Sequence, residues 1–192
     1  MMKMHMFLIT ALCSFLLCVS CDDGGGSAAV TGTVTYAIGD TGPGGGIVFY
    51  ITDGGEHGLE AAPADTSTGI RWNNGHNTVT AASAVVAGYG DVNTGTIIAA
   101  QGAAETSYAA GLACAYSGGG FSDWFLPTRD ELNLMYVNLK CAAVPLGNFA
   151  NGYYWSSSEY DSGLAWFVDF SAGSMSGESK CSALRVRAVR EF

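Results

Sequence analysis

The stretch YYWSSSEYDSGLAWFVDF, from Tyr153 to Phe170, gives the clearest indication of the fold. It is rich in aromatic, β-branched and small residues, which is typical of strands, and YDSG (Tyr160–Gly163) has the composition of a turn. Side chains alternate between the two faces of a strand. In AWFVDF this alternation predicts a core face and an outward face, formed respectively by Trp166, Val168 and Phe170 and by Ala165, Phe167 and Asp169.

The chain closes with ALRVRAVREF, which predicts a last strand. Arg185 and Arg187 share one face of that strand, whereas Arg190 is out of phase with them. Either a bulge intervenes or both faces carry a guanidinium group. A buried arginine needs a carboxylate partner, and Glu131 and Glu159 are the candidates.

The segment DWFLPTRDELNLMYVNL predicts a helix. Thr128 and Glu131 match the S/T-x-x-E capping box, in which two side chains accept hydrogen bonds from backbone N–H groups at the helix start. Apolar side chains then follow at helical spacing and form one face. These side chains are Leu132, Met135, Tyr136 and Leu139.

The remaining segments complete an α+β pattern. Ile47–Ile51 is apolar on both faces, which indicates a central, doubly covered strand, and Glu56–Asp65 predicts a turn and a short strand. The alanine-rich Thr80–Tyr116 predicts helix, broken around Gly88–Gly95. With a hairpin turn at Ser171–Ser174, the order is strands, two helices and then mixed or antiparallel strands. We therefore predict an α+β domain whose helices are segregated from the final sheet.

The N-terminal segment MMKMHMFLITALCSFLLCVSC has the layout of a secretory signal peptide, with a lysine, an apolar run and a small residue in order. The last two residues resemble the lipobox of bacterial lipoproteins, which implies lipidation, including palmitate, at Cys21. We expect a signal peptide at 1–20, a lipidated cysteine with a flexible tether at 21–33, and a ligand-binding domain at 34–192. The protein would then be lipid-anchored in a bacterial membrane. We expect the outer membrane and the cell surface, and leave the inner membrane open.

The net charge of the chain argues against some classes of binding partner. A formal net charge of −9 argues against nucleic acid and other polyanions, because these are bound by Lys and Arg. A local patch of Arg185 and Arg187 stays open as an exception. After the leader, no run approaches the ~18 apolar residues of a membrane span.

Cysteines and other reactive residues give no sign of catalysis. Cys114, Cys141 and Cys181 follow the leader, so at least one of them is unpaired in an exported chain. A Cys114–Cys141 disulfide and three free thiols both remain open. After the leader, no CxxC motif, His/Cys cluster or Ser/His/Asp order stands out, so we expect no metal, no cofactor and no enzymatic activity.

Four motifs in order resemble a bacterial domain family with a C-type-lectin-like fold: DWFLPTRDEL, YYWSSSE, AWFVDFSAG and VRAVREF. That family is related to the formylglycine-generating-enzyme superfamily, and the same motifs resemble the C-terminal domain of the Legionella collagen-like adhesin. GDTGPGGGIVFY and HGLEAAPAD look like its N-terminal half. The resemblance spans about Ala37 to Phe192 and implies a C-type-lectin-like fold for the whole domain.

The end of the chain is also similar to variable lipoproteins of diversity-generating retroelements, especially of the Treponema type. In that family a reverse transcriptase rewrites a terminal variable region, while the lectin-like fold holds a constant frame. The resemblance implies a scaffold of Trp155, Glu159, Trp166, Phe170, Arg187 and Arg190. It implies variable, ligand-binding positions at Tyr160, Asp161, Ser162, Gly163, Leu164, Phe167, Asp169, Ser171, Ala172, Ser174, Ser176, Glu178, Ser182 and Leu184.

The resemblance implies a surface-exposed lipoprotein, expected to be a monomer, that binds a protein or cell-surface ligand through this C-terminal patch. The patch combines aromatic side chains with Ser, Gly and Asp, as antibody paratopes do. One alternative is a non-diversified adhesin or structural module of the collagen-like-adhesin type. Another is a formylglycine-generating type of enzyme, which depends on reactive cysteines beside a groove. The EPN and QPD calcium-site motifs of true C-type lectins are absent from the sequence.

Overall fold

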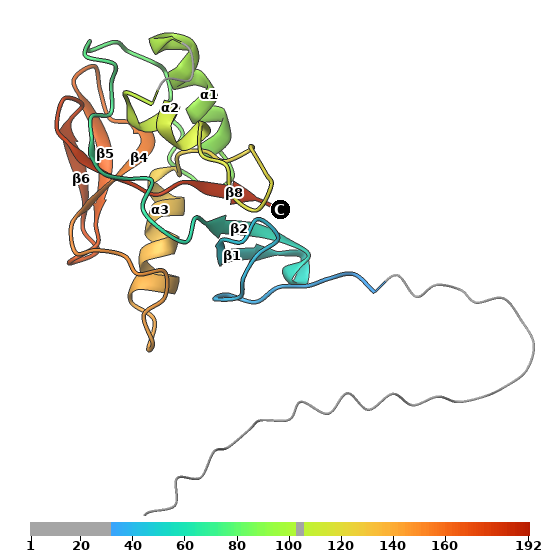
Figure 1. The fold of residues 1–192 in the computed structure, drawn as a ribbon. Coiled ribbons are helices and arrows are strands. Elements are labelled where there is room, and N and C mark those ends of the chain that lie inside the picture. The colour runs from blue at the N-terminus through green and yellow to red at the C-terminus, as the bar shows by residue number, and fades with distance from the viewer. Residues whose placement is uncertain (1–31, 103–105) are drawn as a thin grey trace, which may run out of the picture. The chain divides into compact units, whose positions relative to one another are not determined.

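A computed structural model of the protein describes residues 32–102 and 106–192, so the expected signal peptide and the lipidated Cys21 lie outside the described residues. The predicted α+β class is confirmed (Figure 1). The described part contains two sheets and three α-helices, one helix more than expected. None of the helices in this part has the length and apolar character needed to cross a bilayer.

The smaller sheet has the strand order β1-β2-β8 and is antiparallel throughout. Its strands are β1 (Ile47–Thr52), β2 (His57–Ala61) and β8 (Val189–Glu191), and a 3₁₀ turn (Asp53–Gly55) joins the first two. The strand predicted at Ile47–Ile51 is present, but it lies at the edge of the sheet. The prediction of a central strand was wrong because the middle position is taken by β2, which pairs with the distant end of the chain.

The larger sheet has the strand order β3-β7-β4-β5-β6. Its strands are β3 (Ser67–Ile70), β4 (Tyr153–Glu159), β5 (Leu164–Asp169), β6 (Met175–Ser179) and β7 (Leu184–Val186). All neighbours are antiparallel except β4 and β7. The predicted turn at Ser171–Ser174 joins β5 to β6, and Gly173 adopts a φ of 74° there with the Tyr136 ring directly beneath it.

The three helices are α1 (Gly90–Gln101), α2 (Ala109–Cys114) and α3 (Arg129–Met135), and α3 continues into a π-helical turn at Tyr136–Lys140. The capping box at the start of α3 is confirmed. The expected helix from Thr80 is wrong, because residues 80–86 are irregular and α1 begins inside the expected break. The amide N–H of Thr80 and the carbonyl of Ala82 bond to Glu159, so tertiary hydrogen bonds replace the helical ones.

The central strands β4 and β5 of the larger sheet are covered on both faces. On one face, Trp155 and Phe167 of β4 and β5 pack with Trp72 and with residues of α1 and α2. On the other face, Val168 and Phe170 pack with the apolar side of α3. Two cores therefore lie on opposite sides of one sheet, as the apolar character of both faces of β5 requires.

This double covering corrects the predicted orientation of β5. Phe167 is 8% exposed and belongs to the core, although the sequence placed it outward. Trp166, expected in the core, is half-buried. The alternation itself is correct, but alternation separates two faces without indicating which one is covered. Ala165 is likewise fully buried.

The closing arginines use carboxylates other than those predicted. Asp65 accepts hydrogen bonds from Arg185 and Arg187, at 3.0 Å and 2.8 Å, and from the hydroxyl of Tyr154. Burial, with a further contribution from Asp65, raises the pKa of Tyr154 to about 12, so the phenol stays protonated and donates. Both guanidinium groups share the single carboxylate of Asp65, and Arg187 is buried, so of the local basic patch that the sequence left open only Arg185 is partly exposed.

Arg190 is out of phase because the closing strand is divided between the two sheets. Arg187 follows β7 of the larger sheet, whereas Arg190 lies in β8 of the smaller one. Arg190 binds Asp123 at 2.6 Å and Glu60 at 3.0 Å, so neither Glu131 nor Glu159 serves as the arginine partner. Glu60 is fully buried.

The glycine-rich segment before β1 explains how a buried Glu60 is tolerated. Its carboxylate accepts hydrogen bonds from the N–H groups of Gly44 and Gly46, at 2.8 Å and 2.9 Å. A Cβ atom at Gly44 would lie only 2.5 Å from a carboxylate oxygen of Glu60. Only glycine lets the backbone approach this closely, so the segment encloses a carboxylate of the protein itself.

Candidate ligand-binding surface

A buried ion pair anchors the β4–β5 loop (Tyr160–Gly163). The ammonium group of Lys180 is fully buried and contacts the carboxylate of Glu159. Lys180 also donates to the carbonyls of Thr78 and Ser162, each at 3.1 Å. One cation thus joins three separate segments of the chain, because an ammonium group can donate three hydrogen bonds.

The carboxylate of Glu159 extends this connection. It accepts hydrogen bonds from the N–H groups of Thr80 and Ala81, between 2.9 and 3.0 Å. The Lys180 ammonium lies 4.8 Å from the centre of the Trp72 ring, a favourable cation–π distance. The charges are therefore paired and hydrogen-bonded, which is the condition for keeping them away from water.

At the β4–β5 loop, Tyr160 and Trp166 form an aromatic pair in which Tyr160 is exposed and Trp166 is half-buried. The rings of Tyr160 and Trp166 are 4.7 Å apart, and the guanidinium of Arg129 lies 4.9 Å from the Trp166 ring. Tyr160 also lies against Gly177, the residue paired with Trp166 across β5 and β6. Tyr160 is 52% exposed, so a rigid aromatic surface faces the solvent. We call Arg129, Tyr160 and Trp166 the aromatic cluster.

The structure places most of the predicted variable positions at the surface, but not all of them. The exposed ones are Tyr160, Asp161, Ser162, Ser171, Ala172, Ser174 and Ser176. The partly exposed ones are Gly163, Leu164, Asp169, Glu178 and Ser182. Phe167 and Leu184 are buried, at 8% and 9% exposed, because both lie on the core face of the larger sheet.

These positions are spread over both ends of one hairpin and over the strand between them. Tyr160–Leu164 meets the end of β6, since Leu164 pairs with Ser179 and the Lys180 N–H bonds to Gly163. Ser171–Ser174 forms the turn at the opposite end of the same hairpin. A six-residue strand such as β5 is about 20 Å long. The predicted positions therefore extend along the β5–β6 hairpin, from the Tyr160–Leu164 loop past Ser176 and Glu178 of β6 to the turn at Ser171–Ser174.

Several acidic side chains of the predicted set stabilise local turns. Asp161 accepts from the N–H groups of Gly163 and Leu164, at 2.7 Å and 2.8 Å. Asp169 accepts from the N–H of Ser171 at 2.7 Å. These bonds fix the backbone of the loops, while the remaining lone pairs of each carboxylate stay available to solvent or a ligand.

Sequence reasoning missed three residues at this end of the sheet, Arg129, Asn73 and Asn77. Arg129 was considered only as part of the capped helix, and its contact with Trp166 joins residues far apart in the chain. Asn73 and Asn77 lie beside Cys181, with nitrogen–sulfur and oxygen–sulfur distances of 3.8 Å and 3.9 Å. The polar composition of the segment around Asn73 was the available signal.

The residues predicted as scaffold are mostly internal. Trp155, Glu159, Phe170, Arg187 and Arg190 are all buried. In the part of the chain that the structure describes, Cys114, Cys141 and Cys181 are free thiols, so the open alternative of a Cys114–Cys141 bridge is not formed. Within residues 32–102 and 106–192, no group of three or more His, Cys, Asp or Glu side chains could hold a metal ion.

Residues 62–190 match the family model of the Lcl C-terminal domain, which is more than half of the chain. The chain belongs to this family. The match includes β3 to β7, all three α-helices and the aromatic cluster. A search of curated proteins found no match. Together with the α+β arrangement of two sheets and three helices, membership of the Lcl C-terminal domain family confirms the resemblance to C-type-lectin-like domains.

Proposed function

We propose that this protein is a surface lipoprotein that binds a protein or cell-surface ligand without catalysing a reaction. The observation that supports this proposal best is the aromatic cluster, which adjoins the loop that the buried Glu159–Lys180 pair anchors. Aromatic and arginine side chains contribute most of the binding energy at protein interfaces, particularly where they are held in place beforehand. An adhesin or variable-protein role also agrees with membership of the Lcl C-terminal domain family.

The proposed site consists of the aromatic cluster and the adjoining Tyr160–Leu164 loop. The polar neighbours of the cluster, such as Asp161 and Ser162, supply adaptable hydrogen bonding. A rewritten loop would be tolerated here, because the loop is attached through backbone carbonyls and the buried ion pair. We therefore include in the proposal that a diversity-generating retroelement rewrites this loop.

Binding can be tested with the secreted domain, residues 34–192, applied to intact bacterial and host cells and measured by flow cytometry. We expect Tyr160→Ala to abolish binding while lowering the free energy of unfolding by only about 1 kcal/mol, because Tyr160 is 52% exposed. Trp166→Ala should also abolish binding but lower stability more, because Trp166 is half-buried. Phe167→Ala should instead cost roughly 3–5 kcal/mol, as for a buried aromatic side chain.

Val144→Ala is a matched control, because Val144 is 74% exposed and lies outside the cluster. Equal loss of binding in Val144→Ala and Tyr160→Ala would contradict a specific site. The membrane anchor is tested by Cys21→Ala, which should move the protein from the membrane fraction to the soluble fraction. Unchanged retention in the membrane would contradict the lipoprotein proposal.

A non-diversified adhesin remains the second candidate, and it shares the site. A reverse transcriptase and a template repeat beside the gene would favour diversification, as would relatives that differ only at the variable positions. Their absence from the gene's neighbourhood would favour the plain adhesin.

A further inference from the structure

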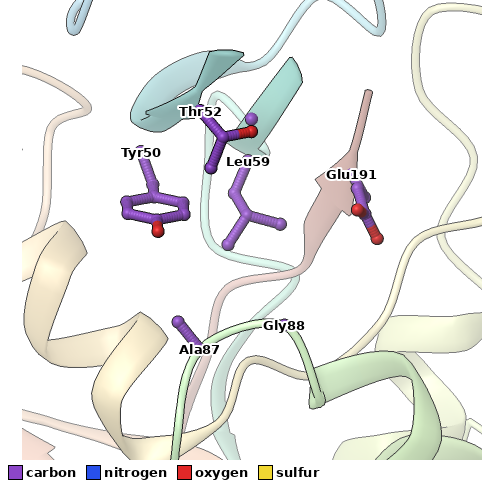
Figure 2. Close-up of a pocket in the computed structure, with 7 residues that line it drawn as sticks. Tyr50, Thr52, Leu59, Ala87, Gly88 and Glu191 are labelled. Atoms are coloured by element: carbon purple, nitrogen blue, oxygen red, sulfur yellow. The ribbon is translucent and has the colours of Figure 1, made fainter.

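A pocket of about 200 Å³ lies on the smaller sheet, away from the aromatic cluster. Figure 2 shows Tyr50, Thr52 and Leu59 extending from β1 and β2 toward the loop that carries Ala87 and Gly88. Glu191 lies on the β8 side of the same space. The pocket is smaller than the roughly 300–1,000 Å³ of sites for drug-sized ligands, so it suits a small chemical group.

The strand register explains why these side chains converge. Tyr50 pairs with Leu59, and Leu59 pairs with Glu191, so the three residues form one row across β1, β2 and β8. Residues directly opposite each other in an antiparallel sheet point to the same face. Thr52 is two residues from Tyr50 and therefore shares that face.

The opposite wall is fixed in place. The N–H of Gly88 donates to the buried carboxylate of Glu131 at 2.8 Å, which ties the loop to the start of α3. The pocket is thus formed by a sheet on one side and an anchored loop on the other.

Three polar side chains of the pocket make no hydrogen bond or ion pair in the part of the chain that the structure describes. Among residues 32–102 and 106–192, no hydrogen bond or ion pair involves the carboxylate of Glu191 or the hydroxyls of Tyr50 and Thr52. The neighbouring Arg190 is directed to Glu60 and Asp123 instead. The pocket therefore presents one negative charge and hydrogen-bond acceptors beside the apolar surfaces of Leu59 and the Tyr50 ring.

We propose that this pocket binds a terminal ammonium or guanidinium group carried on a short alkyl chain. The carboxylate of Glu191 would pair with the cation at the β8 side of the pocket, and the hydroxyls of Thr52 and Tyr50 remain free to bond to polar parts of the ligand elsewhere in the pocket. The alkyl part would pack on Leu59, and the aromatic ring of Tyr50 favours a cation nearby. The net charge of −9 adds long-range attraction for cations and repels carboxylates and phosphates.

The chemistry can come from a free alkylamine or from a basic side chain of a protein. We would titrate the purified full chain with n-butylamine and with the peptide acetyl-Gly-Lys-Gly-amide, following backbone amide NMR shifts. Saturable shifts at Leu59, Gly88 and Glu191 are expected, whereas n-butanol and butyrate should cause none. Binding of n-butylamine alone assigns a free amine, and binding of the peptide as well assigns basic side chains.

Variants separate the pocket from general charge effects. Glu191→Gln should weaken binding about ten-fold or more, the loss expected for a charged hydrogen bond. Glu56→Gln is the matched control, because it removes the same charge from an exposed side chain outside the pocket. Ala87→Leu should also weaken binding by filling the space. Equal effects of the two glutamine variants, or no saturable shift with either cation, would overturn the proposal.

Discussion

At the residue scale, the pair Glu159 and Lys180 accounts for the shape of the proposed binding surface. Both side chains are buried, and together they bond to Thr78, Thr80, Ala81 and Ser162. Glu159 is four residues from Trp155 in β4, so strand alternation places it on the same face as Trp155, the face on which Trp72 and Lys180 lie. The intervening serines are buried and bond to neighbouring segments.

We predict that Lys180→Met lowers the free energy of unfolding by about 3–5 kcal/mol, because it leaves the Glu159 carboxylate buried without its cation. Urea denaturation measures this loss. The double variant Glu159→Gln with Lys180→Met should recover a large part of it. If the two changes are simply additive, the pair is not coupled and this account of the loops is wrong.

At the element scale, α3 shows how a local motif acquires a tertiary role. The capping box of Thr128 and Glu131 follows from four residues of sequence. The same carboxylate of Glu131 also accepts from Gly88 and Gly90, which fixes the loop before α1. No local pattern indicates this second role, since those glycines lie some forty residues earlier in the chain.

Glu131 should give the protein an unusual pH dependence. Burial raises the pKa of Glu131 above its ordinary value of 4.5, although hydrogen bonds from backbone amides partly oppose the rise. The folded state therefore binds this proton more tightly than the unfolded state, and stability from this group increases as the pH falls toward 4.5.

We predict that the wild-type protein gains stability relative to Glu131→Gln as the pH falls from neutral toward 4.5. Thermal unfolding of both proteins across this range measures the difference. Asp130→Asn is the control, because Asp130 lies in the same helical turn at the surface. A stability difference that is constant with pH, or that changes in the opposite direction, would contradict the raised pKa.

The strand β5 marks the limit of sequence reasoning for the candidate site. Alternation correctly grouped Trp166 with Phe170 and separated them from Phe167. It could not assign exposure, because β5 is covered on both faces and α3 leaves only the Trp166 end uncovered. The spread of the predicted variable positions likewise follows from the length of the hairpin, whose two ends carry the Tyr160–Leu164 loop and the Ser171–Ser174 turn.

At the scale of the whole molecule, the last residues of the chain connect the two sheets. β7 lies in the larger sheet and β8 in the smaller, with only Arg187 and Ala188 between them. The backbone of Phe125 also bonds to Val189 in both directions, which attaches the segment before α3. Arg187 and Arg190 add ion pairs on either side of the junction.

We predict that a chain ending at Ala188 fails to form a cooperative fold, because the smaller sheet loses β8 and Glu60 is left buried without Arg190. Near-UV circular dichroism and the sharpness of thermal unfolding measure this. Removing the residues before Thr33 is the control and should preserve both signals, since Thr33–Phe192 forms one compact unit. A cooperative transition in the shortened chain would show that the larger sheet is stable alone.

The sequence by itself determined the α+β class, the capped helix, the C-terminal strands and the turn at Gly173, because each depends on neighbours within a few residues. Only the tertiary structure decided the edge position of β1, the division of the closing strand and the partners of every buried charge. It also decided that Phe167 is buried while Trp166 joins Tyr160 and Arg129 at the surface. These features depend on contacts between distant segments, and no local pattern encodes which segment will cover which face.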